Sequence, residues 1–102
     1  MENDNLRAVC EYLTLKKHFF FRVNTTPIYD TKRQAFRAMP KYAMKGVPDI
    51  ILIWNGNFIG LEVKQKGTYQ SKDQKIFEQL SKQAGAEYYV VRNSDDLVVI
   101  GL

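Results

Sequence analysis

The chain of 102 residues contains a single cysteine, Cys10. One cysteine cannot form an intramolecular disulfide, which is typical of proteins in a reducing compartment. No apolar run approaches the roughly 18 residues that span a bilayer, and no stretch resembles a signal peptide. A disulfide-built secreted scaffold and a helical membrane span are therefore excluded. We expect an intracellular, cytoplasmic protein with no membrane partner.

Proline is also scarce, with three residues, and acidic residues are outnumbered. Hydrophobic residues make up 45% of the chain and aromatic residues 13%, which gives no reason to expect disorder. A chain of this length supports one hydrophobic core, so we expect a single domain over residues 1–102. Fifteen Lys and Arg against 11 Asp and Glu give a formal charge of +4, a modest bias toward polyanionic partners.

Hydrophobic patterning predicts two helices. The first covers about residues 3–17, because apolar side chains recur there at helical spacing. The second covers about 72–84, where Ser71 and Gln74 form a capping box before an apolar stripe and Gly85 ends the helix.

Five strands are predicted from aromatic and β-branched stretches bounded by turn residues. Asn55-Gly56 is the strongest short signal for a two-residue hairpin turn. The element order is then α-β-β-β-α-β-β, an α/β (α+β) domain. The strands are expected in 18–24, 49–54, 57–64, 87–91 and 97–102.

The segment 25–46 has no sustained hydrophobic period and is rich in basic residues. We expect part of it to pack as an extra hairpin or a turn of helix, since long structureless loops are uncommon in compact domains. Its cations are placed to meet DNA phosphates, although a solvated loop is the alternative for any one of them. The candidate DNA-binding residues are Lys32, Arg33, Arg37, Lys41 and Lys45, with Arg22 and Lys66 extending the surface.

The hairpin turn also determines which side chains meet. A two-residue loop at 55–56 places Trp54 opposite Asn57, and the same register continued along the strands places Asp49 opposite Glu62. Their Cβ atoms would then lie ~5 Å apart on one face. Lys64 shares that face, because side chains alternate along a strand.

Two carboxylates opposite each other on a sheet destabilise it unless a cation lies between them. Mg²⁺ prefers oxygen ligands, and a bound divalent ion could activate water and polarise a phosphodiester, with Lys64 orienting the water or stabilising the transition state. The alternative is structural: Asp49 begins a turn, and Glu62 and Lys64 form a solvated edge pair. The combined pattern favours the metal site.

Pro48-Asp49 before one strand and Glu62-Val63-Lys64 on the next resemble the signature of the PD-(D/E)XK nuclease superfamily. An ordered set of motifs that covers nearly the whole chain resembles one family within it, VRR-NUC, the virus-type replication-repair nucleases. These motifs are "RVN" at 22–24, "GVPD" at 46–49, "GLEVK" at 60–64 and "QSKDQKIF" at 70–77.

The resemblance implies a restriction-endonuclease-like core, a central mixed sheet flanked by helices in the order α-β-β-β-α-β, and dependence on Mg²⁺ or Mn²⁺. It also implies cleavage of branched DNA. Stand-alone members, typically encoded by phages, are implied to act in the host cytoplasm as homodimers that resolve four-way (Holliday) junctions. The alternatives are a nuclease for flaps or linear DNA and a non-catalytic DNA-binding module. A dimer is separately suggested by the apolar strand expected at 97–102, which could leave an exposed edge or face.

The resemblance also assigns residues. Metal ligands map onto Asp49, Glu62 and the backbone carbonyl of Val63, and the catalytic lysine onto Lys64. A glutamine on the helix after the motif maps onto Gln74, whose alternative role is the helix cap, and we do not expect one side chain to serve both at once.

The family further carries an acid on the first helix, which could also reach the metal. Glu2 and Glu11 compete for this role. We choose Glu2, because it projects from the stripe that packs on the sheet, whereas Glu11 faces about 140° away from Leu6. The alternative for Glu2 is a first-turn acid that faces the helix dipole.

Overall fold

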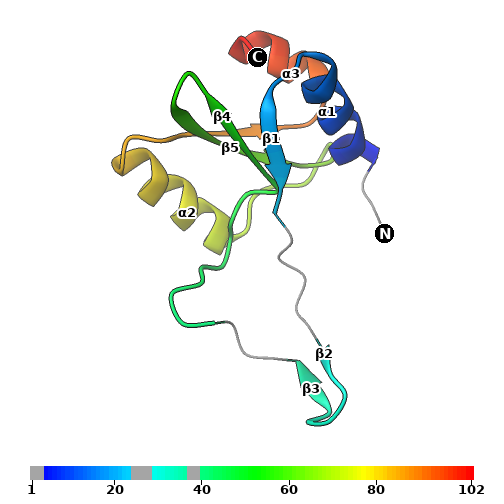
Figure 1. The fold of residues 1–102 in the computed structure, drawn as a ribbon, viewed down its shortest axis with the longest axis vertical. Coiled ribbons are helices and arrows are strands. Elements are labelled where there is room, and N and C mark those ends of the chain that lie inside the picture. Colours follow the sequence, from blue (N-terminus) through cyan, green and yellow to red (C-terminus); the bar gives the residue numbers. More distant parts are fainter. Residues whose placement is uncertain (1–3, 24–28, 37–39) are drawn as a thin grey trace.

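The computed structural model describes residues 4–23, 29–36 and 40–102. In these parts of the chain a four-stranded sheet is flanked by helices, and a two-stranded hairpin projects from it (Figure 1). The mixed α+β class expected from the sequence is thereby confirmed. The helices are α1 (Asp4–Leu15), α2 (Lys72–Gln83) and α3 (Ser94–Ile100). The strands are β1 (Phe19–Arg22), β2 (Tyr29–Asp30), β3 (Ala35–Phe36), β4 (Ile50–Trp54), β5 (Asn57–Val63) and β6 (Glu87–Val91).

The central sheet has the strand order β1-β4-β5-β6. The hairpin between β4 and β5 forms in the predicted register, from Trp54 opposite Asn57 to Ile50 opposite Leu61. Asn55 and Gly56 have φ angles of 51° and 79°, as this tight turn requires. β1 adds to β4 in antiparallel fashion, and β6 adds to β5 in parallel, so the sheet is mixed.

The core lies between one face of the sheet and the helices α1 and α3, while α2 lies on the other side, against β6 (Figure 1). Alternation along β4 and β5 sends their larger apolar side chains toward α1 and α3. The same alternation directs Gly60 and Glu62 to the α2 side. The buried cluster consists of Leu6, Val9, Leu13, Ile50, Leu52, Ile59, Leu61, Val63, Val91, Leu97 and Leu102.

The strand predicted over 97–102 is wrong, because residues 94–100 form the helix α3. The Asn93 side chain accepts a hydrogen bond from the Asp96 N–H, and Gly101 ends the helix in the left-handed conformation at φ 103°. Residues 93–96, between the two predicted strands, are therefore a helix cap and first turn. The β-branched residues that suggested a strand do not outweigh these end signals, so this segment offers no strand edge to a second chain.

Of the two alternatives for the basic segment, the hairpin forms. β2 and β3 pair through Tyr29–Phe36 and Asp30–Ala35, and Asp30 Oδ1 accepts hydrogen bonds from two backbone N–H groups of the turn. We call residues 29–36 the arm; it extends away from the sheet (Figure 1). Separately, among the residues described, no helix is long and apolar enough to cross a membrane.

Candidate functional site

Asp49 sits where the strands β1, β4 and β5 come together. The ladder between β4 and β5 stops at Ile50, so Asp49 occupies the next register position without a ladder partner. Its carbonyl accepts a hydrogen bond from the Val23 N–H at 2.9 Å, and its side-chain Oδ2 accepts one from the Val63 N–H, also at 2.9 Å. Backbone and side chain are thus held by neighbouring segments, which fixes the carboxylate at the end of β5.

Glu62 is buried rather than displayed on an open surface, with 2% of the residue exposed. Its Oε1 accepts a hydrogen bond from Gln74 Nε2 at 2.9 Å and lies 3.8 Å from Lys64 Nζ. Its Oε2 is buried, and none of the described residues donates a hydrogen bond to it. An acceptor in that state is rare in folded proteins and points to a group that is not part of the chain.

Burial raises the pKa of Glu62 to about 8, and the negative charge of Asp49 adds to the effect, while Lys64 opposes it. A hydrogen bond between the two carboxyl groups also raises this pKa. Two carboxyl groups can hydrogen-bond only through a proton, so this contact forms when one of them is protonated and is lost when both are ionised. A cation bound between the two carboxylates would stabilise them as the proton does.

Gln74 forms the helix cap and a hydrogen bond with the buried acid at the same time, so the two contacts do not exclude each other; its catalytic role stays a prediction. Its Oε1 accepts from the Ser71 N–H at 2.8 Å, and its Nε2 donates to Glu62 at 2.9 Å. The reason is that a primary amide carries its acceptor and its donor on different atoms. Because a backbone N–H can only donate, the oxygen must face Ser71 and the nitrogen must face Glu62.

Gly46 allows the segment before Asp49 to pass directly against the start of α2. It has φ +76°, and a Cβ at this position would lie 2.4 Å from the backbone C and O of Asp73 and 2.7 Å from the backbone N of Gln74. Only glycine permits this approach. The contact keeps the first turn of α2, and with it Gln74, over Glu62.

Lys64 lies where β5, β6 and the start of α1 meet. Its side chain is 19% exposed, its N–H donates to the Val91 carbonyl at 3.0 Å, and its carbonyl accepts from Asn5 Nδ2 at 3.3 Å. The ammonium group is therefore held beside Glu62 and still reaches solvent. Of the residues predicted for the site, the structure brings together Asp49, Glu62, Lys64 and Gln74.

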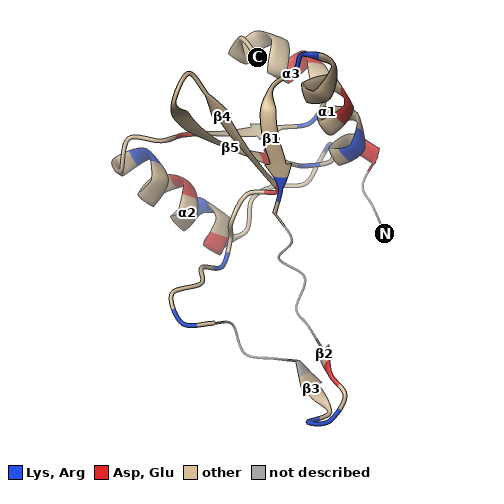
Figure 2. Ribbon diagram, viewed as in Figure 1, with Lys and Arg blue, Asp and Glu red and all other residues tan. Residues whose placement is uncertain are grey.

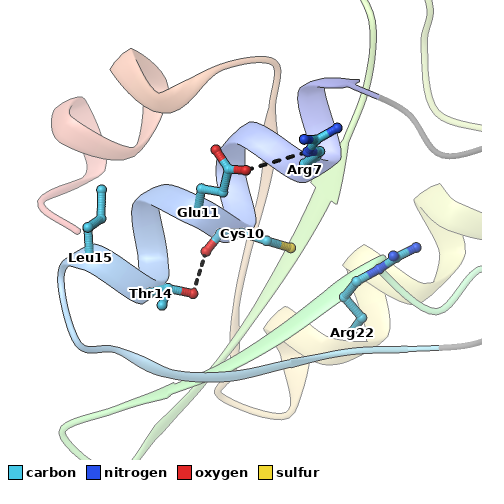
Figure 3. A pocket seen from close by; sticks show the side chains of 6 residues that line it. All are labelled: Arg7, Cys10, Glu11, Thr14, Leu15 and Arg22. Carbon is cyan, nitrogen blue, oxygen red and sulfur yellow. Dashed lines mark hydrogen bonds and ion pairs between the residues drawn. The ribbon is translucent and has the colours of Figure 1, made fainter.

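The structure does not test the remaining site predictions. Glu2 lies outside the described residues. Glu11 is exposed and pairs with Arg7 at 3.5 Å, and together with Arg22 these residues line a pocket of about 450 Å³ beside α1 (Figure 3). Within residues 4–23, 29–36 and 40–102, no group of three or more His, Cys, Asp or Glu residues gathers around a common point. The Val63 carbonyl as a ligand stays a prediction.

Those candidate DNA-binding residues that the structure describes lie on exposed segments (Figure 2). Lys32 and Arg33 occupy the turn of the arm, and Lys41 and Lys45 follow on the segment that leads back to the sheet. Lys66 lies in the exposed turn after β5. Arg37 lies outside the described residues. Contact of these side chains with DNA stays a prediction.

Two features around the acids were not predicted from the sequence. Tyr88 is 2% exposed, and burial raises its pKa to about 12. It packs over Gly60, where a Cβ would lie 2.9 Å from Pro48 Cγ and 3.2 Å from the Tyr88 ring. A glycine inside a strand signals such an approach and could have indicated it. The contact of Gly46 with α2 had no comparable sequence signal.

The chain was compared with family models, with curated proteins and with solved structures, and none of them matches it. The functional assignment therefore rests on the residues of the site and on their chemistry.

Proposed function

We propose that the chain is a metal-dependent, structure-specific DNA endonuclease of the VRR-NUC type, with a restriction-endonuclease-like core, that cleaves branched DNA such as four-way junctions. The observation that carries the proposal is the carboxylate pair of Asp49 and Glu62 with Lys64 at 3.8 Å from Glu62 Oε1. Burial of Glu62 beside a second acid destabilises the fold, so a purely structural role does not account for it.

The donor set fits a hard divalent cation, Mg²⁺ or Mn²⁺. The site offers two carboxylates, and one of them has a buried oxygen that accepts no hydrogen bond from the part of the chain that the structure describes. Such ions take one or two protein carboxylates and complete their coordination with water and substrate phosphate. Bound there, the cation would supply Lewis acidity and a water of lowered pKa.

The chain's own residues hold the reacting groups in place. The Val63 N–H fixes Oδ2 of Asp49, and Gln74 engages Oε1 of Glu62. Lys64 is positioned to orient an attacking water and to stabilise the negative charge that develops on the phosphate. Each of these contacts exists before DNA binds, so little reorganisation is needed at the reaction step.

DNA as the substrate is supported by the formal charge of +4 and by the exposed cations of the arm and the segment after it. A symmetric junction requires two coordinated cuts, and the described residues supply one acid pair for each chain. We therefore propose a homodimer. The C-terminal residues form the helix α3 and offer no apolar strand edge for the dimer. Light scattering that shows a monomer on the junction would contradict the homodimer.

A labelled four-way junction, a flap and a linear duplex, each incubated with Mg²⁺ or Mn²⁺, test the activity. We expect cleavage of the branched substrates by the wild-type protein and none by Asp49→Asn, which binds DNA normally. This variant retains an oxygen that can accept the hydrogen bond from the Val63 N–H. Loss of cleavage would therefore result from the missing negative charge at position 49. Binding without cleavage under every divalent cation would instead support a non-catalytic DNA-binding module.

Metal binding can be measured without DNA. A ligand at about 100 times its Kd stabilises the folded state by about 2.7 kcal/mol. Mn²⁺ should therefore raise the melting temperature of the wild-type protein but not that of Asp49→Asn or Glu62→Gln. Equal shifts in all three proteins would place the ion elsewhere and overturn the metal assignment.

A further inference from the structure

A second surface feature lies on the α2 side of the sheet, close to the acids but separate from them. A pocket of about 320 Å³ is formed by the loop before α2, the first turn of α2 and the end of β6. Its lining combines an aromatic ring, an amide and two cations. The lining residues are Tyr69, Gln70, Lys75, Val90 and Arg92.

Tyr69 is 78% exposed, so its ring contributes little to the core. The guanidinium of Arg92 lies 5.9 Å from the centroid of this ring and donates from Nη2 to the Thr68 carbonyl at 2.9 Å. Arg92 is thus anchored to the same loop that carries Tyr69. The pair presents an accessible aromatic face beside a fixed cation, a combination that binds nucleobases by stacking and cation–π attraction.

Two acids that contact the lining residues are already engaged in hydrogen bonds. Asp96 Oδ2 accepts from the Arg92 N–H at 2.8 Å. Glu78 Oε2 pairs with Lys82 Nζ at 2.9 Å, and Glu78 Oε1 accepts from Gln70 Nε2 at 3.1 Å. Lys75 remains exposed at the rim of the pocket. The local charge therefore favours an anion, which a nucleotide supplies through its phosphate.

The pocket is connected to the candidate active site by short contacts. Gln70 Nε2 lies 3.4 Å from the Tyr88 hydroxyl, and Tyr88 packs on β5 at Gly60, two positions before Glu62. Gln70 also precedes Ser71, whose cap partner Gln74 binds Glu62. A strand that places a phosphate at the acids could therefore place a neighbouring nucleotide at Tyr69.

We propose that Tyr69 and Arg92 form a stacking platform for one unpaired nucleobase of the DNA substrate, with Lys75 contacting the adjoining phosphate. The inference rests on the proposed function, and it explains how the nuclease would distinguish branched DNA from a continuous duplex. In a continuous duplex both faces of each base are covered by its neighbours, whereas a branch point or a single-stranded segment leaves a face free. The platform would thus select DNA structure without reading sequence.

The test compares Tyr69→Ala with Tyr69→Phe, which keeps the ring and removes only the hydroxyl. Both are made in the Asp49→Asn protein, so that binding is measured without cleavage. Loss of one stacked base predicts roughly 5- to 100-fold weaker binding of a branched DNA by Tyr69→Ala. Tyr69→Phe should bind as the parent does, and affinity for a linear duplex should not change in either variant.

A direct readout uses 2-aminopurine at an unpaired position of the branched DNA, since its fluorescence responds to stacking. The parent and Tyr69→Phe should change the signal on binding, and Tyr69→Ala should not. Equal affinity and equal signals in all three proteins would overturn the platform, as would an equal loss of affinity for linear duplex. Because Tyr69 is 78% exposed, all variants should melt at the same temperature.

Failure of the platform and failure of the proposed function give different results. Cleavage is compared between the wild-type protein and the single variant Tyr69→Ala, both with intact Asp49. If both cut the junction at the same rate and position, the platform is wrong and the nuclease assignment stands. If no protein cuts DNA but Tyr69→Ala still loses affinity for branched DNA alone, the platform stands and the nuclease assignment is wrong.

Discussion

Gln74 and Glu62 are joined by a hydrogen bond of 2.9 Å from Nε2 to Oε1, and the same Gln74 side chain caps the helix α2 through Ser71. The start of α2 and the orientation of the buried acid are consequently coupled. A change that moves the first turn of α2 also moves the donor that holds Oε1 of Glu62. The two contacts of Gln74 use different atoms, so substitutions can remove one and keep the other.

Gln74→Glu should keep the cap and lose the contact with the acid. A glutamate at this position can still accept from the Ser71 N–H, as in the common capping box, but it cannot donate to Glu62 when ionised. Loss of such a supporting contact typically lowers metal affinity or activity by about 10- to 100-fold. Titration with Mn²⁺ and the rate of junction cleavage measure the effect.

Ser71→Ala is the matched control. It removes the side-chain cap, which should lower the free energy of unfolding by about 1 kcal/mol, and it leaves the amide on Glu62. Its affinity for Mn²⁺ should stay close to that of the wild-type protein. If Gln74→Glu binds Mn²⁺ as well as Ser71→Ala does, the amide has no role at the acid.

The stability of the metal-free protein should fall as pH rises toward 8. The pKa of Glu62 is raised from 4.5 to about 8 in the folded state, so between these values the unfolded chain releases a proton that the folded chain keeps. At about 1.4 kcal/mol for each pKa unit, the loss is on the order of 4 kcal/mol. Urea unfolding in EDTA at pH 5, 6.5 and 8 would measure it.

Glu62→Gln is the control for this pH dependence, because it has nearly the same shape and does not titrate. The variant should lose most of the slope between pH 5 and 8 and should be more stable than the wild-type protein at pH 8. If the free energy of unfolding depends on pH in the same way in both proteins, Glu62 is not the group that keeps a proton in the folded state.

The hairpin register could be predicted from the sequence because a two-residue turn at Asn55-Gly56 determines it locally. The meeting of Asp49 with the end of β5 follows from that register. Burial of Glu62 could not be predicted in the same way, since it depends on α2 packing across β5 from ten or more residues away along the chain. The same applies to the contact of Gly46 with the backbone of Asp73.

The error at the C-terminus has a different cause. Residues 97–100, Leu-Val-Val-Ile, have high strand propensity, and this outweighed the helix signals at both ends of the segment. Asn93 caps the helix, two acids follow in its first turn, and Gly101 ends it. Propensity over four residues is a weaker indicator than a complete set of end signals.

Gly46→Ala should destabilise the protein more than a Gly→Ala substitution at a glycine that has no close neighbours. Its new Cβ would lie 2.4 Å from the backbone of Asp73, so either α2 or the segment before Asp49 must move. Overpacking of this kind typically costs about 1–3 kcal/mol, in addition to the strain of a positive φ. Chemical unfolding measures the loss, and Mn²⁺ affinity should fall because Gln74 moves with the helix.

Gly67→Ala isolates the contribution of backbone strain. Gly67 has φ +83°, close to the +76° of Gly46, but a Cβ there would meet nothing within 4 Å. We expect a loss of about 1–2 kcal/mol for Gly67→Ala and unchanged Mn²⁺ affinity. Equal effects of the two substitutions would mean that the close contact between Gly46 and α2 does not hold the site together.

Substitutions in residues 97–99 distinguish the helix α3 from a strand. In a strand, Leu97 and Val99 would share one face, whereas in the helix Leu97 is fully buried and Val99 is 86% exposed. Leu97→Ala should therefore lower the free energy of unfolding by about 2–5 kcal/mol. Val99→Lys should change it by less than about 0.5 kcal/mol. A large loss for Val99→Lys in the monomer would support the strand, and a loss that appears only as dissociation of a dimer would instead mark α3 as the interface between two chains.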